Sequence, residues 1–186
     1  MFSQTTNILN FSPEIMDIGI PYYYTATITK WHKLLRLDKY KDVIISSLQY
    51  LVEKKKIKVF AFVIMPNHIH LVWTMLEKNG KEMPHASFMK YTGHIFLEDL
   101  TVNHPQVLPY FEVNSTTRKY HFWQRNSLPV LLHSYKFWNQ KIDYIHNNPC
   151  VAKWNLSDLP ENYKYSSAKF YLEGIDEFGI LTHWQK

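Results

Sequence analysis

Two histidines one residue apart, His68 and His70, lie within the apolar segment MPNHIHLVW, residues 65–73. Alternate side chains on a β-strand point to the same face, so both imidazoles would project together, away from Ile69 and Leu71. Nitrogens at this spacing can chelate one divalent metal ion. The chain has 10 histidines, so the pair is a weak signal by itself, and two strand histidines without a function would give the same pattern.

Two other kinds of histidine chemistry fit the pair less well. A nucleotidyl hydrolase or transferase of the histidine-triad type would need a third histidine at position 72, where this chain has Val72. A zinc hydrolase would need a further histidine or carboxylate ligand and an open position for water. The remaining histidines considered for that role, none at a recognisable spacing, are His94, His104, His121, His133 and His146.

A tyrosine near the end of a predicted helix, in the segment DYIHNNP, is a second candidate for chemistry. Tyr144 lies off the apolar stripe of that helix, and Asn148, four residues later, shares its face. A phenol beside a metal ion could attack a phosphodiester, and the Asn148 amide could supply an oxygen ligand. The alignment of the two side chains depends on Asn148 keeping helical angles before Pro149, which such a position disfavours. A half-buried packing tyrosine is the alternative.

Periodicity predicts the elements that must position these residues. Runs of β-branched and aromatic residues predict strands over 22–30, 57–65 and 68–74, with a further strand around 120–123. Apolar residues at helical spacing predict helices over 38–55, 84–100 and 131–148, the first with Asp38 as a candidate N-cap. A turn at Pro66-Asn67 makes the second and third strands a hairpin.

The order β-α-β-β-α-β-α predicts an α+β fold, a ferredoxin-like split βαβ antiparallel sheet with helices on one face and an additional C-terminal helix that carries Tyr144. Residues 1–186 would form a single domain, with residues 1–20 as an N-terminal extension and residues 172–186 as a C-terminal tail. The apolar face of the histidine strand would pack under the helices, leaving both imidazoles on the open side of the sheet.

Composition bounds the class of protein and its location. With 46% hydrophobic residues and no long apolar run, the sequence indicates a globular protein that does not span a membrane. The first twenty residues lack the features of a signal peptide, and Cys150 is the single cysteine, so we expect a reducing, cytoplasmic, nucleoid-associated location.

The charge balance indicates an anionic partner. The net charge is +5 and the pI about 9.1, and the cations lie among many aromatic residues, a combination suited to single-stranded nucleic acid. A layer of solvated lysines over an aromatic core would give the same composition.

Five motifs in order resemble those of the REP-associated tyrosine transposases of the IS200-like superfamily, over residues 22–171. They are FAFVIMPNHIHLVW, SFMKYTGHIF, FWQRN, DYIHNNPCVA and YKYSSAKFY. Members of that superfamily are HUH single-strand DNA endonucleases, and HIH in this chain is similar to their histidine motif. The resemblance implies that Tyr144 is the nucleophile and that Asn148 occupies the position where IS200 relatives have a glutamine ligand.

The implied mechanism is metal-dependent strand transfer. Mg²⁺ or Mn²⁺ held by His68, His70 and Asn148 would orient a phosphate near a hairpin in single-stranded DNA, and Tyr144 would form a 5′-phosphotyrosine link. The cations proposed to contact the DNA backbone are Lys54, Lys55, Lys56 and Arg125. Other tyrosines considered as nucleophiles are Tyr135, Tyr163 and Tyr165.

Three alternatives are left open by the sequence. A catalytically silent module could bind single-stranded nucleic acid on the open sheet, and a metal hydrolase could release a free 5′-phosphate without a covalent link. The superfamily also includes homodimers that exchange their tyrosine helices and members that act as single chains, and the sequence does not decide between these arrangements.

Overall fold

Apolar, β-branched and aromatic residues build an antiparallel sheet at the centre of the computed structural model, which describes residues 16–116, 118–125 and 129–185. The strands are β1 (Pro21–Thr27), β2 (Ile57–Ile64), β3 (His68–Met75) and β4 (Val130–Leu131), in the spatial order β2-β3-β1-β4. This is the α+β, ferredoxin-like arrangement that the order of the elements predicts. Residues 1–15 of the predicted N-terminal extension lie outside the described residues.

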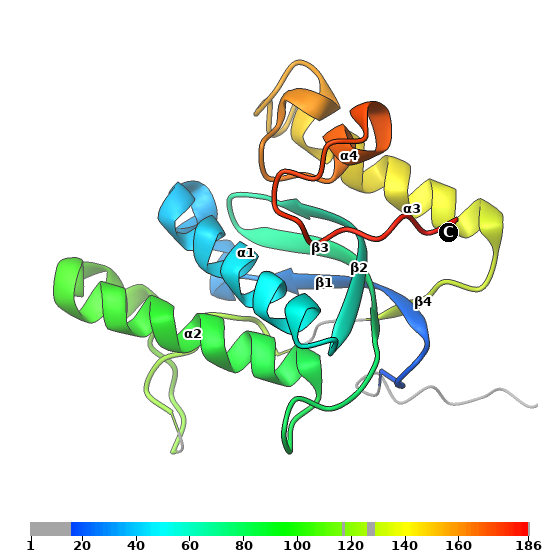
Figure 1. Cartoon of the computed structure of the whole chain (residues 1–186). Coiled ribbons are helices and arrows are strands. Elements are labelled where there is room, and N and C mark those ends of the chain that lie inside the picture. Colours follow the sequence, from blue (N-terminus) through cyan, green and yellow to red (C-terminus); the bar gives the residue numbers. More distant parts are fainter. Residues whose placement is uncertain (1–15, 117, 126–128, 186) are drawn as a thin grey trace, which may run out of the picture.

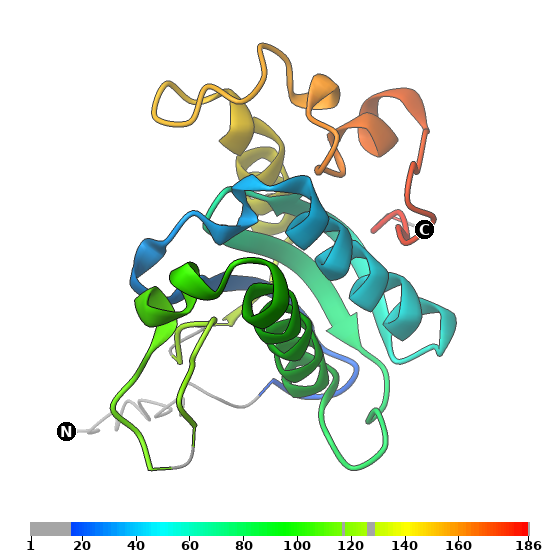
Figure 2. The same cartoon turned by 90° about the vertical axis from the view of Figure 1, so that its left-hand side faces the viewer.

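Two long helices cover one face of the sheet. The α1 (Asp38–Glu53) and α2 (Pro84–Asn103) helices lie side by side against it (Figure 1 and Figure 2). The core between them and the sheet is built from buried aromatic and aliphatic side chains, among them Tyr24, Trp73 and Phe96. The α1 helix begins at Asp38, so this residue is the first helical position and Leu37 is the N-cap, which corrects the predicted cap.

The opposite face is covered by the C-terminal part of the chain. The α3 helix (Tyr135–Asn147) packs on it through Ile142 and Ile145, and the short α4 helix (Ala168–Glu173) follows (Figure 1). Short 3-10 helices at 29–31, 34–36, 105–111, 148–150 and 160–162 connect the elements. The face that bears the two histidines is therefore not open, and the expectation of exposed imidazoles is wrong: α3 and the segment after it bury them.

The fourth strand lies later in the chain than predicted. The expected strand at 120–123 forms only isolated bridges, Glu112 with Tyr120 and Ile28 with Trp123, while Val130 and Leu131 pair with Tyr23 and Tyr22 on β1. Leu131 thus belongs to the sheet, and α3 begins at Tyr135 because the Ser134 hydroxyl caps it. The helix predicted over 131–148 therefore begins four residues later in the structure.

The first strand is shorter than its sequence indicates. It ends at Thr27, and residues 29–31 form a 3-10 turn in which Lys30 and Trp31 have positive φ angles of 53° and 59°. The chain therefore leaves the sheet level with His68, which pairs with Thr27. None of the helices formed by the described residues combines the length and the apolar character that a membrane crossing requires.

Candidate active site

His68 begins the central strand β3 and is held by its chain neighbour. Its side chain is 6% exposed, and its Nδ1 lies 2.7 Å from the Oδ1 of Asn67. The Asn67 Nδ2 donates to the Trp31 carbonyl at 3.2 Å, which leaves Oδ1 as the acceptor facing the ring. His68 must therefore carry its proton on Nδ1, so its Nε2 presents a lone pair, as a metal ligand requires.

His70 is held by two hydroxyl groups from β1. The ring is 5% exposed, and its Nδ1 lies 2.8 Å from both the Tyr23 Oη and the Thr25 Oγ1. Thr25 is the direct cross-strand partner of His70. The Nε2 of His70 is buried and has no hydrogen-bond partner among the described residues. A buried nitrogen without a partner costs free energy unless something binds it, which makes this atom a candidate ligand.

Burial keeps both imidazoles neutral. Desolvation, then the nearby charge of Lys153, lowers the pKa of His68 to about 4. Desolvation, then His68 and Lys141, lowers the pKa of His70 to about 3. The two ring centroids are 4.7 Å apart. At neutral pH the pair offers uncharged nitrogens, the form in which histidine binds metal ions.

Tyr144 approaches His70 within the same chain. Their ring centroids are 5.3 Å apart in an edge-to-face arrangement, although the two residues are far apart in sequence. The α3 helix places Tyr144 over the histidine strand because Ile142 and Ile145, on its neighbouring face, pack into the core below. Tyr144 is 51% exposed, so about half of the residue is open to solvent.

Asn148 continues the same helical face as Tyr144. Its φ of −55° and ψ of −42° are helical, so the alignment with Tyr144 is kept despite Pro149. The residue is 5% exposed, and its buried Oδ1 has no hydrogen-bond partner among the described residues. A side-chain amide oxygen is a donor type that Mg²⁺ and Mn²⁺ take, and a neutral imidazole nitrogen can bind divalent metal ions.

Among the described residues, any third protein ligand at this site would have to come from a residue type other than His, Cys, Asp and Glu. Across residues 16–116, 118–125 and 129–185, no cluster of three or more His, Cys, Asp or Glu side chains could hold a metal ion. Three histidines weighed as extra ligands are engaged elsewhere: His94 pairs with Glu98, His121 faces the Trp123 carbonyl, and His146 contacts the Ser167 hydroxyl. His68, His70 and Asn148 stay the predicted ligand set.

Several residues around the site are not predicted by the sequence analysis. Tyr23, Thr25 and Asn67 hold the imidazoles, and Trp154 lies against His68 with its ring centroid 5.6 Å away. A usable signal existed for the first two, since they alternate on a strand that must pair with the histidine strand. For Trp154, which follows the helix in an irregular segment, no periodic signal was available.

The lysine cluster predicted to contact DNA lies at the other end of the sheet from His68. Lys54, Lys55 and Lys56 precede β2, whose first residue, Ile57, pairs with Met75 at the far end of β3. The strand rise of about 3.3 Å per residue separates that level from His68 by roughly 20 Å. Lys56 also forms an ion pair with Glu77 at 2.8 Å.

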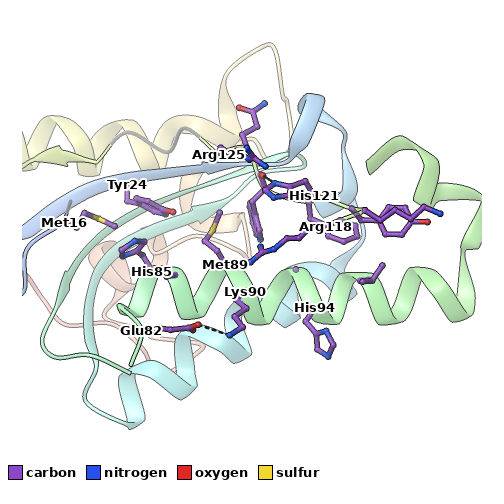
Figure 3. A pocket seen from close by; sticks show the side chains of 18 of the residues that line it. Met16, Tyr24, Glu82, His85, Met89, Lys90, His94, Arg118, His121 and Arg125 are labelled. Carbon is purple, nitrogen blue, oxygen red and sulfur yellow. Dashed lines mark hydrogen bonds and ion pairs between the residues drawn. The ribbon is translucent and has the colours of Figure 1, made fainter. Parts of the chain in front are cut away.

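Arg125, the other predicted DNA contact, lines a separate groove of about 930 Å³ between α2 and residues 118–125 (Figure 3). Its lining includes basic residues from both sides, Lys90, Arg118 and Lys119, over buried Phe122 and Trp123. The groove is not lined by the histidine pair or by Tyr144, so the structure keeps it apart from the candidate metal ligands.

The other tyrosines considered as nucleophiles have different surroundings. The Tyr163 hydroxyl donates to the Ile64 carbonyl at 2.8 Å, and the Tyr165 hydroxyl donates to Asp42 at 2.9 Å. Burial, the larger cause for both, raises their pKa above the usual range of a phenol. Tyr135 is exposed at the start of α3 and accepts a hydrogen bond from Gln185 at 2.6 Å.

Comparisons with known proteins give a likeness in fold. The sequence matches no protein-family model and no curated protein. Among solved structures, the chain is similar to a REP-associated tyrosine transposase bound to a REP hairpin, with a TM-score of 0.57 and 16% sequence identity. The similarity covers 88% of this chain and 86% of that chain. At this identity the likeness establishes a shared fold.

Proposed function

We propose that this protein is a metal-dependent single-stranded DNA endonuclease and strand transferase, a transposase that cleaves near hairpins with Tyr144 as its nucleophile. The observation that carries the proposal is the half-exposed Tyr144 ring, 5.3 Å from the ring of a buried histidine whose Nε2 lacks a partner among the described residues. A phenol beside two neutral imidazoles that could bind a divalent metal ion is an arrangement suited to phosphotyrosine chemistry.

The fold likeness supports the same function. A structural neighbour is a REP-associated tyrosine transposase bound to a REP hairpin, and we transfer the class of partner, DNA with a hairpin, to this chain as part of the proposal. The Tyr144 contact forms within one chain, so the proposed chemistry needs no second copy. A homodimer and a cytoplasmic, nucleoid-associated location stay predictions.

His68, His70 and Asn148 would hold Mg²⁺ or Mn²⁺, which when bound would draw electron density from a phosphate oxygen. The protein's own contribution is orientation, because Asn67 fixes one ring and the Tyr23 and Thr25 hydroxyls fix the other. Burial keeps both rings uncharged, so neither must lose a proton before it binds the ion.

The covalent step exchanges one phosphoester bond for another and needs no nucleotide cofactor. The Tyr144 Oη attacks phosphorus and forms a phosphotyrosine bond, while the bond from phosphorus to the 3′-oxygen breaks. The phenol proton leaves to water, to which the side chain is open, and the departing 3′-oxygen takes up a proton. Attack by another 3′-hydroxyl would reverse the step and join new ends.

Backbone contact by Lys54, Lys55, Lys56 and Arg125 belongs to the proposal as well. Arg125 is exposed on the rim of the basic groove, whereas the lysines lie at the far end of the sheet. A single strand that reaches the lysines from Tyr144 must cross the length of the sheet. Charge contacts of this kind would weaken uniformly with added salt.

The test is adduct formation. Labelled hairpin DNA with randomised single-stranded flanks is incubated with protein and Mn²⁺, and the expected product is a protein-DNA adduct that survives denaturant. Tyr144→Phe should abolish the adduct and keep DNA binding. Tyr135→Phe is the matched control, an exposed tyrosine on the same helix, and should form the adduct like the unaltered protein.

Each of the other possible results would indicate a different function or a different nucleophile. Binding of the pool without any adduct, across both manganese and magnesium, would favour a silent nucleic-acid-binding module. Release of free 5′-phosphate that Tyr144→Phe leaves unchanged would favour a metal hydrolase. An adduct that persists in Tyr144→Phe would move the nucleophile to another tyrosine.

A further inference from the structure

A tryptophan stands at the edge of the site without being part of the core. Trp31 is 58% exposed and ends the turn that follows β1. Its ring lies edge-to-face to that of His68, with 6.4 Å between the centroids. A single exposed aromatic side chain is ordinary on a protein surface. This one lies beside a candidate metal ligand.

The backbone holds Trp31 in an unfavourable conformation. Lys30 and Trp31 have φ angles of 53° and 59°, in the left-handed region, and neither is glycine. Such a conformation costs about 1–2 kcal/mol per residue and persists only where the surroundings impose it. This strained conformation exposes a large side chain to solvent instead of burying it. It therefore does not stabilise the fold.

The hydrogen bonds that impose this conformation connect Trp31 to the histidine pair. The Trp31 amide donates to the Ile28 carbonyl at 2.9 Å, and its own carbonyl accepts from the Asn67 Nδ2 at 3.2 Å. The other end of the same amide, Asn67 Oδ1, accepts from the His68 Nδ1 at 2.7 Å. One asparagine therefore ties the backbone of Trp31 to the His68 ring.

The charges near Trp31 favour a polyanion. Lys30 and Lys33, on either side of Trp31 in sequence, are exposed, and Lys153 lies close enough to His68 to lower its pKa. An indole face with ammonium groups around it matches a nucleotide, whose base stacks on the ring while its phosphate meets the cations.

We infer that Trp31 is a base-binding subsite, where one unpaired base of single-stranded DNA stacks so that the neighbouring phosphate lies at the His68–His70 pair. This inference rests on the proposed function. It adds a contact to the bases, whereas the lysines and the arginine of that proposal contact the DNA backbone. Through Asn67, the stacked base and the His68 ring would be held in one fixed relation, so Trp31 would position the strand for Tyr144.

The test compares two polymers of equal charge in a Tyr144→Phe background, where no cleavage occurs. One is a short oligothymidylate and the other is an oligonucleotide of the same length made of abasic residues. Trp31→Ala should weaken binding of the oligothymidylate about 5- to 150-fold, the factor expected for losing one stacked base. Binding of the abasic polymer should not change, and Trp31→Phe should keep most of the affinity for oligothymidylate.

Tyr91→Ala is the matched control, because Tyr91 is 48% exposed on α2, in the other layer of the fold. It should leave both affinities unchanged. Equal affinities of Trp31→Ala and its parent for oligothymidylate would overturn the inference, as would equal weakening for both polymers. Failure of the parent to bind oligothymidylate would overturn it too. The proposed function fails separately, when protein with Tyr144 intact forms no adduct, and a base-binding Trp31 would then belong to a silent module.

Discussion

Removal of the hydroxyl groups that face His70 should weaken metal binding without unfolding the protein. Tyr23 and Thr25 both lie 2.8 Å from the same nitrogen, Nδ1, on the side of the ring away from the orphaned Nε2. With the proton on Nδ1, these oxygens accept it and leave the Nε2 lone pair for the ion. The perturbations are Tyr23→Phe and Thr25→Val, which keep the shape of each side chain.

The magnitude follows from the shared nitrogen. A net hydrogen bond is worth about 0.5–1.5 kcal/mol, but each single variant leaves the other hydroxyl in place, so each should cost less than about 5-fold in Mn²⁺ affinity. The double variant leaves Nδ1 with neither partner and should reach the range of about 10- to 100-fold that is typical when such outer partners are lost. The double loss should therefore exceed the product of the two single losses.

The assay is calorimetric titration of Mn²⁺ into each variant, with thermal unfolding recorded in the absence of metal. Tyr22→Phe serves as the control, because Tyr22 is the neighbouring strand residue whose hydroxyl accepts from the Asp17 amide in the other layer. It should bind Mn²⁺ like the unaltered protein. A double variant that melts normally and also binds Mn²⁺ normally would refute the claim that these hydroxyls orient a metal ligand.

Three further predictions concern stability. Ser134→Ala removes the hydroxyl that caps α3 and should lower the free energy of unfolding by about 1 kcal/mol in urea titrations, whereas Ser134→Asp should restore it. The carboxyl of Asp99 is partly buried, which raises its pKa, but hydrogen bonds led by those from Lys39 and Tyr40 outweigh this and hold the pKa at about 2, below the ordinary 3.8. The stabilisation is therefore present above pH 4 and lost as the pH falls toward 2, so Asp99→Asn should cost about 1 kcal/mol at pH 7 after allowance for solvent screening, and an equal cost near pH 2 would contradict this. Trp184→Ala removes a ring that stacks on Trp138 at 5.1 Å and should lower the melting temperature by a few degrees, with no effect if the tail were merely draped on the surface.

Local periodicity predicted most of the fold. The strands that hold the site and the two helices below them are long and regular, and their bounds differ from the predicted ones by a few residues. The β4 strand has only two residues, Val130 and Leu131, too few for any alternation to show. The aromatic residues around Trp123 carry strand-like preferences, but they are used to fill the core under α2, where burial outweighs backbone pairing.

The sequence predicts the candidate residues of the site but not their surroundings, because the surroundings depend on contacts between distant segments. Residue types and spacing single out the histidine pair and Tyr144, and a resemblance to transposases links them, while their roles stay predictions. The environment of the pair depends on which residues face each other across strands, such as Thr25 and His70, and one sequence does not give that register. The burial of the pair also requires knowing that α3 crosses this face of the sheet and not the other.

The C-terminal segment takes up the outer edge of β2. The Thr182 amide donates to the Val59 carbonyl, the Tyr171 hydroxyl to the Phe60 carbonyl, and Ser167 and Tyr165 bond to Phe62 and Ile64. Main-chain groups on a free strand edge are a template for another polypeptide, and here they are already occupied by the protein's own residues 165–182. These bonds block self-association through this edge. A chain shortened before these residues would expose the unpaired edge of β2 and would tend toward amyloid-like or domain-swapped assemblies.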